Sequence, residues 1–223
     1  MLRPLKFPDR IAAGRALAPR VLEFTAAPSV VLGVPNGGVL VAAPIAESLA
    51  APLCVAWVRK VVSPAEPDVV LGAVDLDGDM TVATEIVRAE GLSDETLAEV
   101  AYHAHQHLLA QWERMPGLDA SSLLAGTTAI VVDDLICTGM SLRAAMRWAR
   151  KHFVRTVVLA VPVVDGRTWH RVAADADRAL TLEERMDGPF SRSEVYDNFK
   201  RVTDDEVAKV LESFGLPTHA PQA

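Results

Sequence analysis

The sequence predicts an α/β protein built on an open parallel β-sheet of about five strands, with helices packed on both of its faces. Short runs of apolar and β-branched residues alternate along the chain with segments whose apolar residues recur at helical spacing. These runs are apolar throughout, which is typical of strands buried on both faces of a parallel sheet. Half of the 223 residues are hydrophobic, so the chain can bury one large core.

Charge and composition narrow the classes of function. The net charge of -7 at pH 7 argues against a nucleic-acid partner, because proteins of that class generally carry a basic surface. No apolar stretch reaches the roughly 18 residues of a membrane span, and Met1–Arg10 lacks the apolar region of a signal peptide. The two cysteines, Cys54 and Cys137, do not have metal-binding spacing, so we expect a reduced, cytoplasmic protein.

The first half of the chain predicts two strands of the sheet. Residues 9–26 are rich in alanine and predict a helical region broken near Pro19. The runs Ser29–Val34 and Leu53–Val58 predict buried strands. The helix expected between them, over Val39–Ala50, either starts near Pro44 or kinks there.

The middle of the chain predicts a hairpin and a long helix. Residues 61–68 contain two prolines and predict a loop, and the Asp-Gly pair between the runs 69–74 and 80–84 is typical of a hairpin turn. Ser93 is a favourable N-cap for a helix that ends near Met115. The three histidines of that helix lack further metal ligands nearby, so we interpret them as part of its polar face.

The last half of the chain completes the predicted sheet. Thr128–Asp133 and Val154–Val161 predict strands on either side of a helix with an apolar face over residues 142–149. Leu180–Glu184 predicts a short fifth strand, and the capping box of Thr203 with Glu206 opens a final helix. Ligands of such sheets bind at the carboxyl ends of the strands, so the loops 35–38, 59–68 and 133–141 are the candidate sites.

One segment, AIVVDDLICTGMS at residues 129–141, carries the clearest chemistry. A helix that starts after Gly139 presents unpaired N–H groups to a phosphate, and Thr138 and Ser141 add hydroxyl donors. Asp133 and Asp134 suit two adjacent sugar hydroxyls, because carboxylates accept hydrogen bonds on both oxygens. The segment therefore predicts a ribose 5-phosphate site. The alternative is a simple helix cap with solvated acids.

This segment closely resembles the motif by which type I phosphoribosyltransferases bind phosphoribosyl pyrophosphate (PRPP), with Cys137 where a smaller residue is usual. The stretches VLGVPNGGVLVAAPIAESLAAPL, VRKVVSPAEPDVVLGAVDLDG and VYDNFKRVTDDEVAKVL extend the resemblance to a bacterial subgroup of that family over residues 28–214. It implies one domain over 1–223, with a core at about 28–165 and a small hood formed by 166–223 and the N-terminal helix. The implied phosphate cradle consists of Leu135, Ile136, Cys137, Thr138, Gly139, Met140 and Ser141.

The resemblance also implies a pyrophosphate site. Its loop would consist of Pro35, Asn36, Gly37 and Gly38, with a strained or cis peptide at Asn36–Gly37. The subgroup usually has an arginine where Asn36 stands. Arg59 and Lys60 would face the pyrophosphate and offset that missing cation, and residues 61–79 would form a mobile lid. An ordinary tight turn and an exposed charge pair are the alternative interpretations of these two stretches.

On the resemblance, Tyr196 and Phe199 could stack on the base from the hood, but plain packing of the C-terminal helix is the favoured interpretation of this aromatic pair. The implied reaction transfers ribose 5-phosphate from PRPP to a nitrogen of a base or similar acceptor. Mg²⁺ would arrive with PRPP, with no direct protein ligand. Asp75 or Asp77 could act as a general base only if the lid closes. The alternatives are a nucleotide-sensing regulator, and a hydrolase or phosphorylase of ribosyl phosphates. A homodimer is the expected assembly.

Overall fold

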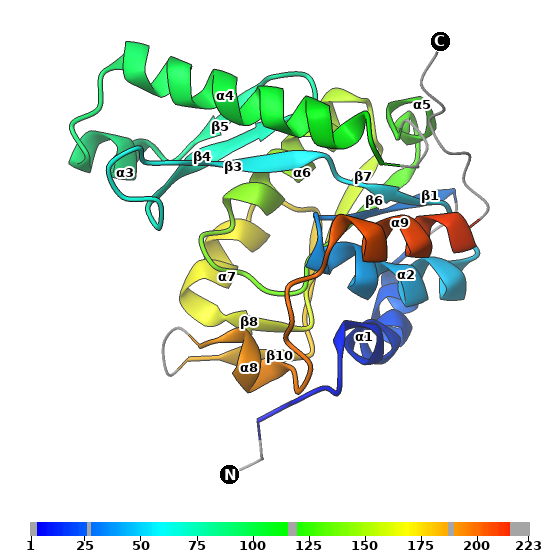
Figure 1. Cartoon of the computed structure of the whole chain (residues 1–223). Helices are drawn as coiled ribbons and strands as arrows, with labels where there is room; N and C mark the ends of the chain where they lie inside the picture. Colours follow the sequence, from blue (N-terminus) through cyan, green and yellow to red (C-terminus); the bar gives the residue numbers. More distant parts are fainter. Residues whose placement is uncertain (1–3, 26–27, 116–119, 187–189, 215–223) are drawn as a thin grey trace.

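A computed structural model describes residues 4–25, 28–115, 120–186 and 190–214 of the chain. Its main sheet has five parallel strands in the order β2-β1-β6-β7-β9, as the sequence predicts (Figure 1). Because all five strands are parallel, their carboxyl ends lie at the same edge, where ligands of such sheets bind. The strands are β1 (Ser29–Gly33), β2 (Leu53–Val55), β6 (Thr128–Val132), β7 (Thr156–Ala160) and β9 (Arg178–Leu180).

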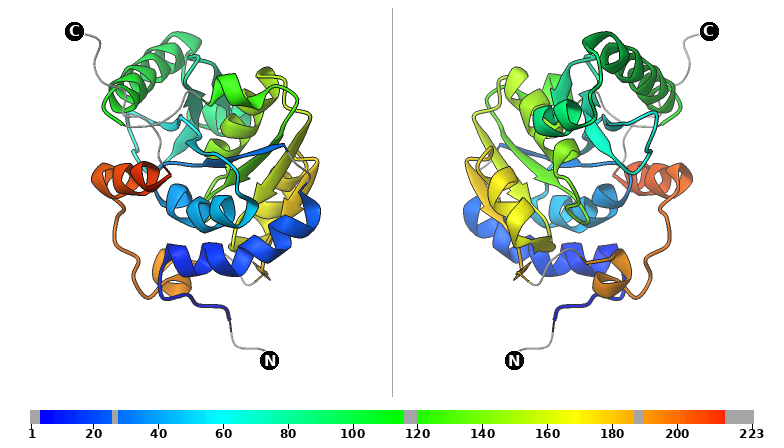
Figure 2. Two further views of the ribbon diagram at one scale, coloured as in Figure 1. Left: turned by 90° about the vertical axis from the view of Figure 1, so that its right-hand side faces the viewer. Right: turned by 90° about the vertical axis from the view of Figure 1, so that its left-hand side faces the viewer.

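Helices cover both faces of this sheet, because neighbouring residues of each strand point to opposite sides. Val31 and Ile130 pack with α1, α2 and α9, whereas Val30 and Val131 pack with α5, α6 and α7. Figure 2 shows the two groups of helices on either side of the strands. The helices are α1 (Arg10–Phe24), α2 (Gly37–Leu49), α5 (Ser121–Leu124), α6 (Met140–Lys151), α7 (Gly166–Ala173) and α9 (Asp204–Ser213).

The sequence predicted a helix break near Pro19 and a helix start or kink at Pro44, but both prolines lie inside continuous helices. Pro19 is within α1, and Pro44 is within α2, which begins at Gly37. The prediction of a break near Pro19 was therefore wrong. Each proline removes one backbone hydrogen bond, but α1 and α2 pack closely against each other and offset that loss. Local propensity could not reveal this packing.

A second, antiparallel sheet of three strands stands beside the main sheet, between helices α4 and α6 (Figure 1). The run Leu53–Val58 is not one strand as predicted, because the chain leaves the parallel sheet after Val55 and enters β3 at Val58. The hairpin at Asp77-Gly78 is confirmed. The elements are β3 (Val58–Val62), β4 (Val70–Asp75), β5 (Met80–Val82), α3 (Thr84–Ala89) and α4 (Asp94–Trp112).

The turn between β4 and β5 is held in place by its own aspartates. Asp75 is fully buried, and its Oδ1 accepts hydrogen bonds from the backbone N–H groups of Asp77 and Asp79. Burial raises the pKa of the Asp75 carboxyl, against the lowering effect of the hydrogen bond from Asp79. Lys151 at the end of α6 pairs with both Asp77 and Asp79. These contacts fix the turn to α6.

A small hood covers one end of the strands, and the predicted bounds of 166–223 plus the N-terminal helix are wrong, because α1, α7 and α9 pack against the main sheet instead. It contains β8 (Val163–Asp165), β10 (Glu183–Arg185) and α8 (Arg192–Val195), and Phe7 packs beside Val195 in its core. The predicted fifth strand at Leu180–Glu184 is wrong in its bounds, because β9 ends at Leu180 and β10 pairs with β8 instead. Among the described residues, no helix is long and apolar enough to cross a membrane.

Candidate functional site

The loop between β6 and α6 forms a small pocket, here called the cradle. Gly139 caps α6 in the left-handed conformation, with φ of 73°, which favours glycine. A side chain at this position would also collide with Val172 of α7. The small pocket here is lined by Lys60, Asp133 and residues 135–142, so the predicted cradle residues lie together. Its N–H groups and the start of α6 favour an anion.

The two acids beside this cradle have different surroundings. Asp134 is buried, and its Oδ2 lies 2.7 Å from Nε of Arg10, whose side chain is also buried. Arg192 lies 3.8 Å from the same oxygen. Gly37 makes room for this pair, because a Cβ there would collide with the carboxylate of Asp134. One oxygen of Asp134 is thus committed to the protein itself.

Asp133 lines the cleft above the cradle and is only partly exposed. Its Oδ1 accepts a hydrogen bond of 2.8 Å from the backbone N–H of Asp134. Burial raises the pKa of the Asp133 carboxyl well above its usual value, the charge of Asp134 adds to this, and Lys60 opposes it. Asp133 is therefore the more available acceptor of the pair.

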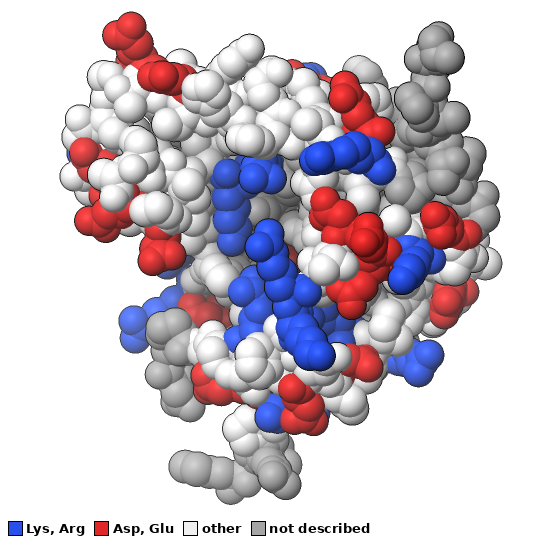
Figure 3. Space-filling model, viewed as in Figure 1, with Lys and Arg blue, Asp and Glu red and all other residues white. Residues whose placement is uncertain are grey.

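A cleft of about 1140 Å³ opens above the cradle, between β3 and α4 on one side and the hood on the other. The described residues that line it include six cations and three carboxylates, although the chain as a whole is acidic. Figure 3 shows Lys and Arg side chains gathered around a hollow at the centre of this face. The cations are Arg10, Arg59, Lys60, Arg114, Arg192 and Arg201, and the carboxylates are Asp133, Asp134 and Asp204.

The predicted pyrophosphate loop lies at the floor of this cleft. Pro35, Asn36 and Gly37 line it, whereas Gly38 is buried beneath, against the carbonyl oxygen of Val132. The cis peptide is Pro35–Asn36, not Asn36–Gly37 as predicted. Gly37 already belongs to α2, so its own peptide has to follow the trans geometry of the helix.

The side-chain amide of Asn36 turns toward the residues that precede α9. Its Nδ2 donates hydrogen bonds to the carbonyl oxygen of Val202 at 3.0 Å and to Oδ1 of Asp204 at 2.9 Å. These two bonds use both of its N–H donors. The amide nitrogen of Asn36 therefore connects the loop to the C-terminal part of the chain.

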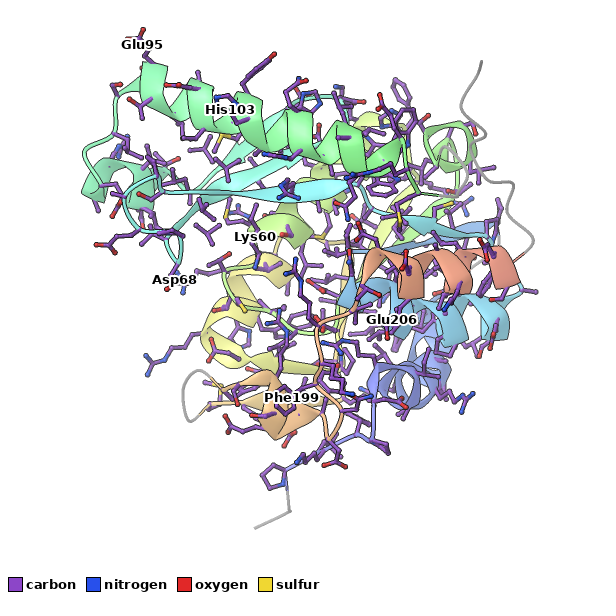
Figure 4. The ribbon with its side chains drawn as sticks, viewed as in Figure 1. Lys60, Asp68, Glu95, His103, Phe199 and Glu206 are labelled. Carbon is purple, nitrogen blue, oxygen red and sulfur yellow. The ribbon has the colours of Figure 1, made fainter. Side chains whose placement is uncertain are left out.

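The predicted aromatic pair is divided by the fold. Phe199 lines the cleft and is 53% exposed, and Figure 4 shows it on the segment before α9. Tyr196 is fully buried, and its hydroxyl donates to the carbonyl oxygen of Asp134 at 2.8 Å. The prediction that Tyr196 stacks on a base is therefore wrong, because the hood packs this ring into its core against Phe7.

Arg59 and Lys60 lie in β3, and both line the cleft (Figure 4 labels Lys60). Residues 63–79 do not line it. The lid predicted for 61–79 is therefore wrong in its extent, since β4 is wholly buried in the second sheet. Asp75 and Asp77 are held in the turn near Lys151, which excludes them as general bases in this structure.

Sequence reasoning missed several residues of the cleft. His107, Gln111 and Arg114 come from α4 and the turn after it, which the sequence placed far from the motif. Arg10 precedes the cradle by more than 120 residues. The only sequence signal for it as a site residue is its position at the start of a helix with an apolar face. No local pattern predicts contacts over such distances.

No group of three or more potential metal ligands occurs among the described residues. The carboxylate of Asp133 in an open cleft nevertheless fits Mg²⁺, because this ion is usually bound by one or two carboxylates together with substrate phosphates and water. The site thus fits an Mg²⁺ ion that is held mainly by the phosphates of the bound substrate.

Comparisons with known proteins agree with this geometry. The phosphoribosyl transferase domain family matches residues 8–198. A Mycobacterium tuberculosis protein, named in two strains as a "putative phosphoribosyl transferase", is 37% identical over 206 residues. That match covers 92% of this chain but 46% of the relative, so the chain spans about half the length of these curated relatives. The crystal structure of TT1426 from Thermus thermophilus is 32% identical, with a TM-score of 0.75, and the match covers 94% of this chain and 99% of that one.

Proposed function

This chain belongs to the phosphoribosyl transferase domain family, and from that premise we propose that it transfers ribose 5-phosphate from PRPP to a nitrogen acceptor, releasing pyrophosphate. The observation that carries the proposal is the position of Asp133 and the cradle 135–142 beneath a basic cleft. A phosphate cradle beside a carboxylate that faces the cleft suits the phosphate and the hydroxyls of one ribose. The cations of the cleft suit a second, larger anion.

In the proposed reaction, the side chains orient PRPP and stabilise charge without becoming covalently attached. The cradle and the start of α6 hold the 5-phosphate, which positions the ribose for attack at C1. Asp133 accepts hydrogen bonds from the ribose hydroxyls, and its negative charge stabilises the positive charge that develops on the ring. The C1–oxygen bond breaks with its electron pair going to pyrophosphate, and the acceptor nitrogen forms the new bond to C1.

Arg59, Lys60 and the loop 35–37 form the proposed pyrophosphate site. Both side chains lie on β3 at the wall of the cleft, opposite the hood. When Mg²⁺ is bound with PRPP, it supplies further neutralisation of the leaving pyrophosphate. Phe199 offers an exposed aromatic ring to a planar acceptor from the hood side. A homodimer remains the assembly that we expect.

Calorimetric titration with PRPP, with and without Mg²⁺, tests the donor site, and release of pyrophosphate with a panel of bases tests the transfer. We expect binding that depends on Mg²⁺, followed by release of pyrophosphate with at least one acceptor. Binding of ribose 5-phosphate or a nucleoside monophosphate without binding of PRPP would overturn the proposal. It would indicate a nucleotide sensor or a hydrolase of ribosyl phosphates.

A further inference from the structure

A short segment at residues 200–204, here called the strap, joins the hood to α9 and crosses one edge of the cleft. Its backbone is tied to two elements of the site. Nη1 of Arg10 donates to the carbonyl oxygen of Lys200 at 3.2 Å, and Nδ2 of Asn36 donates to that of Val202 at 3.0 Å. The strap is therefore fixed by α1, which also holds Asp134, and by the loop 35–37.

The end of the strap is tied to a third element. Oδ1 of Asp204 accepts hydrogen bonds of 2.9 Å from Asn36 and of 2.9 Å from Gln111 of α4. The capping box of Thr203 and Glu206 fixes the start of α9 beside it. These contacts join the floor of the cleft, its α4 wall and the strap in one network.

Arg201 lies in the middle of this strap and lines the cleft. The side chain of the next residue, Val202, is buried in the core, so the strap is anchored while the Arg201 side chain stays exposed. In the described part of the chain, the guanidinium of Arg201 has no ion pair or side-chain hydrogen bond, whereas the guanidinium groups of Arg10 and Arg192 both lie beside Asp134. Among the described residues, Arg201 is therefore a cation without a side-chain acceptor, on a stretch of backbone that is anchored on both sides.

We propose that Arg201 binds the pyrophosphate group of PRPP, and that Asn36 positions it by holding the strap. This inference rests on the proposed function. The ligand is an anion, because a guanidinium donates two parallel hydrogen bonds to phosphate oxygens. Asn36 thus contributes to the pyrophosphate site indirectly, by holding the strap that carries Arg201, a residue distant in the sequence.

The geometry favours the pyrophosphate over the 5-phosphate as the partner of Arg201. The small pocket of the cradle is lined by Lys60, Asp133 and residues 135–142, with no residue of the strap. Arg201 instead adjoins Val202, which is hydrogen-bonded to the loop 35–37. Loss of Arg201 should therefore affect one phosphate site and spare the other.

The experiment is calorimetric titration of the unmodified chain and of R201A, R201K and K209A, with pyrophosphate plus Mg²⁺ and separately with ribose 5-phosphate. We expect R201A to bind pyrophosphate at least about tenfold more weakly, because a charge-assisted hydrogen bond is lost. R201K should recover part of this loss. Affinity for ribose 5-phosphate should stay within about twofold. K209A removes one exposed cation of α9 outside the cleft and should match the unmodified chain.

The variant N36A tests the positioning role. If Asn36 acts by holding the strap, N36A weakens pyrophosphate binding, and the double variant N36A/R201A is no weaker than R201A alone. Strictly additive losses would contradict the positioning role, and equal affinity of R201A and the unmodified chain would overturn the assignment of Arg201. Failure of the unmodified chain to bind either ligand would instead overturn the proposed function, and this inference with it.

Discussion

At the scale of single residues, Asp133 and Asp134 are neighbours of the same type with different tasks. Asp134 is buried and paired with Arg10, and its backbone carbonyl accepts the hydroxyl of Tyr196. Burial is the main cause that raises the pKa of the Tyr196 hydroxyl, so this hydroxyl stays neutral and donates its hydrogen bond. Asp133 faces the cleft with Lys60 nearby. Removal of charge at Asp133 should therefore affect the ligand more than the hood.

Asp133→Asn is expected to stabilise the fold and to weaken ligand binding. The pKa of Asp133 is higher in the folded chain than its ordinary value of 3.8, so its contribution to stability is lost as pH rises through the raised pKa. At neutral pH the substitution should raise Tm by roughly 3 °C, the effect of about 1 kcal/mol in a chain of this size. Affinity for ribose 5-phosphate should fall at least about tenfold. Thermal unfolding and calorimetry measure the two effects.

Glu99→Gln is the matched control, since Glu99 is an exposed carboxylate of α4 that does not line the cleft. It should change neither Tm nor affinity. If Asp133→Asn lowered both Tm and affinity, the carboxylate would be a structural acceptor and not a ligand of the ribose.

At the scale of elements, the crossing of α1 and α2 places two parts of the site. Arg10 is the first residue of α1, and the loop 35–37 leads into α2, so the distance between these helices sets the position of both. The helices approach closely at Gly14, where a Cβ would collide with the carbonyl oxygen of Val41 and lie 2.5 Å from Cγ of Pro44. Glycine is required here by contact between the helices.

Gly14→Ala should destabilise the protein, although the same change in an exposed helix stabilises it by up to about 1 kcal/mol. Overpacking of a tight contact costs about 2 kcal/mol, which outweighs the gain in helix propensity. Urea denaturation followed by circular dichroism measures the difference. Arg15→Ala, at an exposed neighbour on α1, should leave the unfolding free energy nearly unchanged. A stabilising Gly14→Ala would show that α1 and α2 can move apart at little cost.

At the scale of the whole molecule, an acidic chain carries a basic cleft. The net charge is -7, yet six Lys and Arg side chains line the cleft among the described residues. Figure 3 shows acidic side chains close to the edge of the hollow. Local charge therefore attracts a small anion, while the overall charge repels an extended polyanion.

This distribution predicts a strong dependence of pyrophosphate binding on salt. Exposed charges are screened over about 10 Å at 0.1 M salt and about 3 Å at 1 M. Between about 0.05 M and about 0.5 M NaCl, the affinity for pyrophosphate with Mg²⁺ should fall roughly tenfold. Calorimetry in a salt series measures this, and thermal unfolding in the same buffers checks that the fold persists. Constant affinity would contradict a dominant role for the exposed cations.

The sequence by itself determined the parallel sheet and the cradle 135–141, because both follow from local patterns: apolar runs buried on two faces, and a strand that ends in acids before a helix start. It also marked the loop 35–38 and the cations Arg59 and Lys60 as neighbours of that cradle. Only the tertiary structure decided that Asp134 is paired with Arg10, that Tyr196 is buried and that Arg201 lines the cleft. These contacts join residues far apart in the sequence, and their energies depend on packing that no local pattern contains.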